Sequence, residues 1–353
     1  MSETKAPRRK ARARRAGVTM ADVAAEAGVS MQTVSRALRE PRTVAPETLE
    51  LITAAIRKTH YVHNLAASVL ASSRSMTVAA IIPTLSTSVF AETIQSLSDV
   101  VVAKGYQLFV GNTDYRLDRE EDLIRSLLGR RPDGLFIVGT RHTRGAVSLM
   151  KRAGIPVVEG WDLSRRPIDR QIGFSNTDAM DAIVRHLAET GRRRLVFAGV
   201  LRAGDSRARM RRDGFVAASE RIWPDETPRL VDCSDLALTM EDGGAVLERV
   251  EREHPDADAI VLSSDITAAG VLLAAMRRGI AVPGRFAITG FGDFEFARHI
   301  IPSLTTIAVP TRRIGAEAGR LLLDLMSDAA GTRREDGPKT IDVGFELIVR
   351  ESG

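Results

Sequence analysis

A run of polar side chains near the N-terminus has the composition needed to read the edges of nucleic-acid bases. Gln32 can pair with adenine through two hydrogen bonds, and Arg36 can bind guanine or a phosphate. The neighbouring apolar residues Val34, Ala37 and Leu38 recur at helical spacing, which predicts one helix with a buried face. The side chains predicted to face outward from this helix are Met31, Gln32, Thr33, Ser35 and Arg36.

Capping and turn residues in the neighbouring sequence predict the helices that position these polar side chains. Thr19 with Asp22 forms a capping-box pattern at the start of a first short helix, and Gly28 suits the left-handed turn that follows it. Ser30 caps the second helix, and Pro46 opens a third. The sequence therefore predicts a helix-turn-helix domain over residues 18–63, whose second helix enters a DNA major groove. The predicted DNA contacts of this domain are Thr19, Met31, Gln32, Thr33, Ser35 and Arg36. The alternative is an ordinary helical hairpin within a larger domain.

From residue 75 onward, short apolar runs alternate with amphipathic stretches of helical length. This rhythm occurs twice, before and after Gly173, and it predicts two doubly wound α/β subdomains that face each other across a cleft. The predicted strands are 78–82, 108–110, 135–138, 157–158, 195–198, 230–231, 259–262 and 287–289. The predicted helices are 90–104, 118–130, 145–153, 177–191, 207–222, 241–253 and 266–279.

The loops after these strands are expected to hold the ligand of the cleft. Arg207 and Arg211 stand one helical turn apart, and two guanidinium groups there could clamp a carboxylate. The alternative for this region is a solvated basic helix. Asp265 follows a strand and offers acceptors for hydroxyl groups, with a helix N-cap as its alternative. Tyr115, Arg141 and Trp161 lie in the other loops of this kind.

The charge, the cysteine count and the absence of certain motifs exclude several classes of protein function. Residues 1–18 carry a net charge of +6 and the remainder sums to −1, so residues 1–17 are predicted to be a disordered basic arm that contacts phosphates. The single Cys233 allows no internal disulfide, and no apolar run is long enough to span a membrane. Neither a phosphate-binding loop nor a metal-spaced Cys/His set is present, so we expect no enzyme, no cofactor and no metal. The expected location is the cytoplasm, on the bacterial nucleoid.

The chain from about Val18 to its end resembles the lactose/galactose-repressor family of transcription regulators. The resemblance implies a hinge helix or linker over 64–74, in which Asn64 contacts DNA and Leu70 wedges into the minor groove. Without the resemblance, Leu70 would be interpreted as a linker or core leucine. It also implies a periplasmic-binding-protein-like core over 75–353 for effector binding and dimerisation. The expected effector residues are Val89, Phe90, Tyr115, Arg141, Trp161, Arg207, Arg211, Asp265 and Asp293; helix packing is the alternative for the first two.

Within that family, several runs are similar to the repressors of gluconate operons, among them Ile82–Ser86, Arg141–Thr143 and Ile155–Glu159. The sequence departs from that subgroup at Trp161 and Arg211. The resulting hypothesis is a homodimeric repressor of sugar-acid catabolism genes that leaves a pseudo-palindromic operator when a gluconate-like inducer binds. The alternatives are a regulator of the same fold for a neutral sugar, a corepressor-type regulator, and, more distantly, a solute-binding protein.

Overall fold

The computed structural model describes residues 18–62, 74–86, 88–199, 201–202, 204–237, 239–327 and 339–353. Contacts divide the chain into two compact units, Met1–Ser75 and Met76–Gly353. The predicted basic arm, and Asn64 and Leu70 of the predicted hinge, lie outside the described residues.

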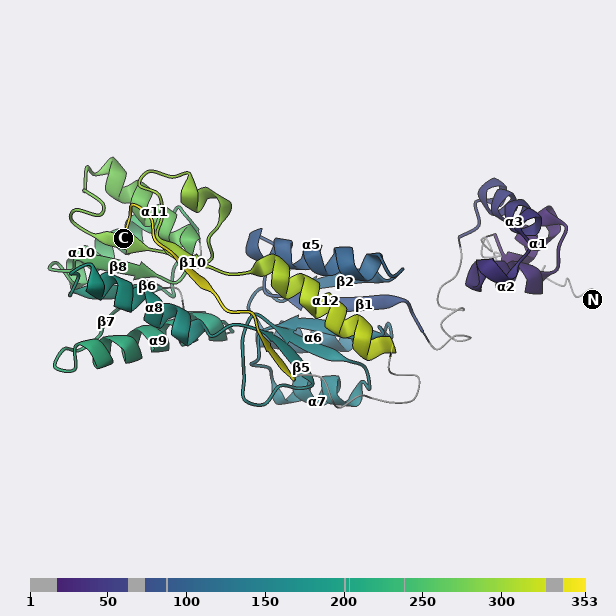
Figure 1. Ribbon diagram of the computed structural model, residues 1–353, viewed down its shortest axis with the longest axis horizontal. Helices are drawn as coiled ribbons and strands as arrows, with labels where there is room; N and C mark the ends of the chain where they lie inside the picture. The colour runs from purple at the N-terminus through teal and green to yellow at the C-terminus, as the bar shows by residue number, and fades with distance from the viewer. Residues whose placement is uncertain are drawn as a thin grey trace, which may run out of the picture. The chain divides into compact units, whose positions relative to one another are not determined.

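The first unit is a small cluster of helices (Figure 1). Its elements are α1 (Met20–Ala27), α2 (Met31–Arg39), the 3-10 helix η1 (Pro41–Thr43) and α3 (Pro46–Thr59). The predicted capping box of Thr19 and Asp22 is present, and the Ser30 hydroxyl accepts from the Thr33 amide at 3.1 Å. Gly28 has φ +67°, the left-handed conformation that the turn requires. Val23, Val34, Ile52 and Ala55 are buried between the helices.

The second unit begins with a parallel sheet in the order β11-β5-β4-β3-β1-β2. The strands are β1 (Thr77–Ile82), β2 (Gln107–Asn112), β3 (Gly134–Val138), β4 (Val157–Gly160), β5 (Arg170–Gly173) and β11 (Thr340–Asp342). Helices α5 (Ser88–Val102), α6 (Leu117–Leu128), α7 (Arg144–Arg152) and α12 (Thr311–Ser327) cover this sheet. Every residue of β1, β3 and β4 is buried, which explains the apolar runs 78–82, 135–138 and 157–158 that these strands contain.

A second parallel sheet has the order β7-β6-β8-β9. Its strands are β6 (Leu195–Gly199), β7 (Arg229–Asp232), β8 (Ala259–Leu262) and β9 (Ala287–Thr289). Its helices are α8 (Asn176–Glu189), α9 (Ser206–Ile222), α10 (Gly243–Glu253) and α11 (Asp265–Arg277), with the short η2 (Glu295–Arg298). The order of strands and helices in both sheets is the predicted doubly wound arrangement.

The chain passes between the two sheets from β5 to α8, from β9 to α12, and from β11 to its C-terminal residues. An antiparallel pair, β10 (Thr306–Ala308) and β12 (Glu346–Ile348), accompanies these passages. The returning helix α12 lies beside α5 (Figure 1). A Cβ on Gly315 would lie 2.1 Å from the Thr93 carbonyl oxygen, so only glycine permits this approach. One apolar cluster includes Phe136 of the first sheet and Phe197 of the second, so the two sheets share a core.

Candidate functional site

The start of α2 presents the polar set of the helix-turn-helix unit. Met31 is 56% exposed, and Gln32 and Arg36 are also exposed. The Thr33 and Ser30 hydroxyls lie 2.8 Å apart in a hydrogen bond, so Thr33 is partly engaged in the cap. Thr19 donates both its amide and its hydroxyl to Asp22 at 2.7 Å. The side chains with donors open to a DNA groove are therefore those of Gln32 and Arg36, on a helix with the buried residues Val34 and Ala37 behind it.

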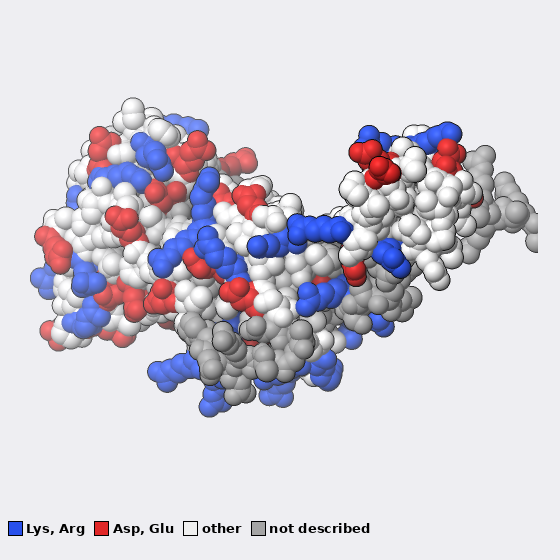
Figure 2. Space-filling view, turned by 45° about the vertical axis from the view of Figure 1, so that its right-hand side comes forward, with Lys and Arg blue, Asp and Glu red and all other residues white. Residues whose placement is uncertain are grey.

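The charges of the second unit are mixed. Figure 2 shows Lys and Arg interleaved with Asp and Glu on the visible face of this unit. The residues after position 18 sum to −1, so the excess positive charge of the chain belongs to its N-terminal segment. None of the helices in the part of the chain that the structure describes is long and apolar enough to cross a membrane.

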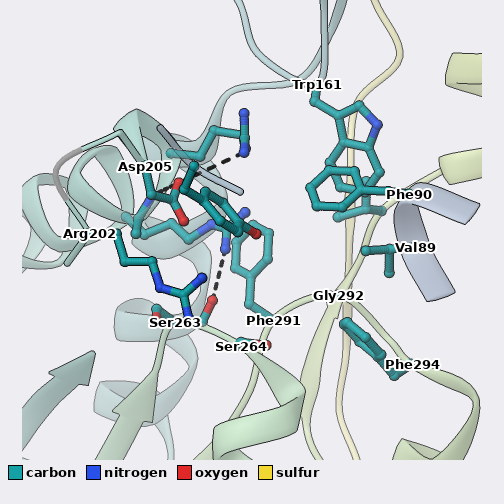
Figure 3. Close-up of a pocket in the computed structure, with 15 residues that line it drawn as sticks. Val89, Phe90, Trp161, Arg202, Asp205, Ser263, Ser264, Phe291, Gly292 and Phe294 are labelled. Atoms are coloured by element: carbon teal, nitrogen blue, oxygen red, sulfur yellow. Dashed lines mark hydrogen bonds and ion pairs between the residues drawn. The ribbon is translucent and has the colours of Figure 1, made fainter. Parts of the chain in front are cut away.

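A pocket lies between the two sheets, at the carboxyl ends of their strands. Figure 3 shows Arg202 and Asp205 on one side of it, with Val89, Phe90 and Trp161 facing them. Six of the predicted effector residues line this pocket: Val89, Phe90, Tyr115, Trp161, Arg207 and Arg211. The prediction had omitted other lining residues, among them the charged Arg202 and Asp205 and the aromatic Phe291 and Phe294.

Arg207 and Arg211, the two predicted effector residues on α9, have different surroundings. Arg207 is 5% exposed and its closest ionic partner is Asp205, at 3.9 Å. Arg211 donates Nε to Asn176 Oδ1 at 2.9 Å and Nη1 to the Ser263 carbonyl at 2.8 Å. Burial lowers the pKa of Arg211 to about 10, which still leaves it charged at neutral pH. Both cations therefore reach the pocket, but among the described residues Arg207 has fewer hydrogen-bond partners than Arg211.

Aromatic rings form much of the opposite wall. The Phe90 and Trp161 ring centroids are 4.7 Å apart, and Trp161 in turn makes an edge contact with Phe174 at 6.5 Å. Trp161 Nε1 is buried and has no hydrogen-bond partner among the residues that the structure describes. Such a wall suits the C–H face of a polyol chain.

Tyr115 and Arg202 meet across the pocket from different sheets. The guanidinium carbon of Arg202 lies 5.1 Å from the Tyr115 ring centroid, in cation–π geometry. Burial, aided by the charge of Asp205, raises the pKa of Tyr115 to about 12. The phenol therefore keeps its proton and can donate a hydrogen bond. Arg202 follows the end of β6 by three residues. The rule that effector residues lie in the loops after strands therefore applied to Arg202 as well.

Asp265 and Asp293 were predicted to bind the effector, but neither lines the pocket. Asp265 is fully buried; its Oδ1 accepts from the Thr306 hydroxyl at 2.6 Å and its Oδ2 from the Phe294 amide at 2.8 Å. Burial raises its pKa to about 7. The alternative N-cap role belongs to Ser264, whose hydroxyl accepts from the Ile266 amide at 3.3 Å. Asp293 accepts from Arg350 at 2.7 Å, and this ion pair accounts for its carboxylate.

Arg141 lies outside the pocket as well, but close to it. It lines a second, smaller hollow, which shares Tyr115 and Arg207 with the first. Its side chain is exposed. Within the described ranges, no cluster of three His, Cys, Asp or Glu side chains could hold a metal ion.

A helix-turn-helix unit joined to a two-sheet core with a ligand pocket defines a DNA-binding regulator with an effector domain. The sequence signature of the bacterial regulatory proteins of the lacI family matches residues 19–64, and that of the periplasmic binding protein-like domain matches residues 184–353. The chain is 36% identical over 334 residues to the HTH-type transcriptional regulator GntR of Pseudomonas aeruginosa, covering 95% of each chain. The chain belongs to the lacI family of transcription regulators.

Further comparisons agree with this assignment. The HTH-type transcriptional regulator IdnR of Escherichia coli is 29% identical over 94% of this chain and 97% of its own length. A crystal structure of a LacI family transcriptional regulator from Silicibacter pomeroyi has a TM-score of 0.86 at 31% identity, covering 95% of this chain and 99% of that one. The operator-bound lac repressor dimer is similar in fold, with a TM-score of 0.78 at 24% identity over 96% and 99% of the two chains.

Proposed function

We propose that the protein represses genes of sugar-acid catabolism and leaves its operator when an acid such as gluconate binds the pocket between the sheets. The observation that carries this proposal is the charge of the pocket. Three guanidinium groups, those of Arg202, Arg207 and Arg211, line it together with a single carboxylate, Asp205. A buried cationic excess favours an anionic ligand over a neutral sugar, because it lowers the cost of desolvating the ligand's carboxylate.

Each part of a sugar acid has a counterpart in this pocket. The guanidinium of Arg207 has no hydrogen-bond partner among the described residues, and its ion pair with Asp205 is long, so its N–H groups can bind a carboxylate. Arg211 adds the N–H groups that Asn176 and Ser263 do not use. The protonated Tyr115 hydroxyl suits the ligand's hydroxyl groups. The Phe90–Trp161 wall suits the C–H groups between them. A carboxylate at Arg207 and Arg211 with the polyol chain along the aromatic wall is the proposed pose.

On the DNA side, we propose that Gln32 and Arg36 contact base edges or phosphates of the operator. The segment 64–74 is the proposed hinge, and the basic arm 1–17 is proposed to add phosphate contacts. Effector binding releases the operator only if the ligand binds the two conformations of the core with different affinities. An operator-binding regulator acts where the chromosome lies, so we place the protein in the cytoplasm, on the nucleoid.

We further propose that the regulator acts as a homodimer. Strand β2 is an edge strand, and Phe109 and Val110 on it are 43% and 39% exposed. Exposed apolar side chains on an unpaired edge favour association, since a monomer would leave them in water. Two recognition helices related by a two-fold axis would match a pseudo-palindromic operator.

Calorimetric titration of the full chain with D-gluconate, and with D-glucose as the neutral control, tests the ligand class. The sequence contains two tryptophans, so Trp223→Phe leaves Trp161 as a fluorescence reporter inside the pocket. We expect gluconate to bind and to change that fluorescence, and glucose to do neither. Binding of glucose without gluconate would reject the sugar-acid ligand. Operator binding measured by fluorescence anisotropy should weaken with gluconate; a strengthened complex would identify a corepressor-type regulator.

A further inference from the structure

A second hollow adjoins the effector pocket. It lies among the loops after β2 and β3 and the start of α9, and its lining includes Arg116, Glu120, Arg141, Gly139, Tyr115 and Arg207. Tyr115 and Arg207 belong to both hollows, so they form the partition between them. A ligand whose end is held at Arg207 can therefore extend from this partition into either hollow.

The second hollow is also positively charged. Its lining contains three arginines and one carboxylate, Glu120. His142 Nδ1 lies 2.8 Å from Glu120 Oε1 in a hydrogen bond, with its Nε2 3.4 Å from Glu159 Oε1. Burial would lower the pKa of His142, but its contacts with Glu120 and Glu159 raise it to about 9. The protonated imidazole compensates one of the two negative charges of Glu120 and Glu159, and the three arginines that line the hollow outnumber its one carboxylate.

Arg141 is the cation best placed to receive a ligand there. Arg116 is occupied by Asp118, which it contacts at 2.5 Å. Arg141 is exposed and has no hydrogen bond or ion pair with any residue that the structure describes. It follows β3 by three residues, which places it at the same edge of the sheet as the effector pocket.

Backbone geometry holds the partition in place. Asp114 and Tyr115 have φ values of +56° and +60°, in the left-handed region that non-glycine residues seldom adopt. The backbone at Gly204 approaches this turn so closely that a Cβ there would lie 1.8 Å from the Tyr115 carbonyl oxygen. A strained turn held against the other sheet is typical of a position where geometry matters for ligand binding.

We infer that the preferred effector is a dianion, an open-chain sugar acid with a second anionic group at its far end, which Arg141 binds in the second hollow. This inference rests on the proposed function, since it takes the first carboxylate to lie at Arg207 and Arg211. A second carboxylate and a terminal phosphate share the required chemistry, because a guanidinium binds either through charge-assisted hydrogen bonds. A monoanionic sugar acid uses the first pocket alone.

Calorimetry of the full chain with D-gluconate, D-glucarate and 6-phospho-D-gluconate tests the inference. We expect at least one of the two dianions to bind about tenfold more tightly than gluconate, the effect of one additional charge-assisted contact. The Arg141→Ala variant should lose this advantage and keep its affinity for gluconate. Because the Arg141 side chain is exposed and has no partner among the described residues, this variant is expected to fold.

The matched control is Arg144→Ala, which removes an exposed arginine three residues further on that lines neither hollow. This control should keep the preference for the dianion. Tighter binding of glucarate alone, or of 6-phosphogluconate alone, supports the inference and identifies the second anionic group as a carboxylate or a phosphate, respectively. Equal affinities for gluconate and both dianions overturn it while leaving the sugar-acid function intact. Absence of binding by all three acids overturns both.

Discussion

The guanidinium carbon of Arg211 lies 3.7 Å from the centroid of the Phe291 ring, so a cation of α9 is stacked on the loop that follows β9. The same side chain also bonds Asn176, at the start of α8, and the Ser263 carbonyl after β8. Arg211 therefore braces three segments of the pocket wall besides offering a charge to the ligand. Removing it would alter the shape of the pocket as well as its charge, whereas Arg207 makes fewer such contacts.

Replacing Arg207 by Ala is the cleaner test of the carboxylate site. Loss of one partner of a desolvated, hydrogen-bonded charge pair costs about 2–5 kcal/mol, so gluconate affinity should fall by tens to thousands of times. The variant should bind operator normally but fail to release it when gluconate is added. Calorimetry and operator anisotropy measure the two effects. An unchanged gluconate affinity would remove Arg207 from the proposed site.

Arg211→Lys separates the charge of Arg211 from its bracing role. Lysine keeps the positive charge but lacks the planar fork that bonds Asn176 and the Ser263 carbonyl at once. We expect Arg211→Lys to weaken gluconate binding nearly as much as Arg211→Ala, and both variants to bind operator. If lysine restores most of the affinity, charge alone matters at this position and the stacking on Phe291 does not.

Gln32 on the exposed face of α2 is predicted to read a base of the operator. If it makes a bidentate contact, Gln32→Ala should cost about 1–3 kcal/mol on the operator and far less on random DNA. Competition titrations with the two DNAs give the comparison. An equal loss on both would show that Gln32 contacts the backbone of the DNA and carries no sequence information.

The elements that sequence analysis predicted are those with strong local signals. Thr19, Gly28 and Ser30 mark the ends of α1 and α2 because caps and left-handed turns depend on a few adjacent residues. Strands such as β1 and β3 are apolar throughout because both faces of their sheet are covered.

Helix α12 was missed, although Ile314, Ala318, Leu322 and Met326 recur every four residues and are buried. The short strands β5, β10, β11 and β12 were also missed, since three or four residues of mixed polarity give little periodicity.

The residues that line the pocket could be predicted from the sequence where the order of strands alone determines their position. Parallel strands bring the loops at their carboxyl ends together, and this rule placed Tyr115, Trp161 and Arg207 in one pocket. Asp265 also follows a strand, but its carboxylate is occupied by Thr306, which lies 41 residues further along the chain. Sequence spacing does not show which distant hydroxyl will satisfy a buried acid, so such an assignment needs the structure.

The exposed edge of β2 leads to a prediction about assembly. Phe109→Asp places a charge among the exposed apolar side chains of this strand, and it should shift the proposed dimer towards monomer and weaken operator binding with it. Sedimentation velocity of the purified chain measures the change in assembly. Lys151→Asp, an exposed position on α7, introduces the same side chain elsewhere and should leave the dimer intact. A dimer that tolerates Phe109→Asp would mean that the two copies meet on another face.

The His142 cluster predicts how stability depends on pH. The pKa of His142 is raised from 6.5 to about 9, because its contacts with Glu120 and Glu159 outweigh the effect of burial. The charged imidazole therefore stabilises the fold fully below pH 6.5, and this contribution is lost as the pH rises through about 9. A shift of this size corresponds to roughly 3 kcal/mol of the free energy of unfolding.

Urea unfolding of the wild-type chain at a series of pH values from 7 to about 9 measures this loss. That range also lies above most of the effect of Asp265, whose pKa is raised from 3.8 to about 7 and whose contribution to stability declines between those two values. The His142→Gln variant should be less stable at pH 7 because it leaves Glu120 and Glu159 buried without a cation, and its stability should change little over the same range. A wild-type free energy of unfolding that stays constant from pH 7 to about 9 would mean that His142 is neutral in the folded protein, and that Glu120 leaves its negative charge in the second hollow.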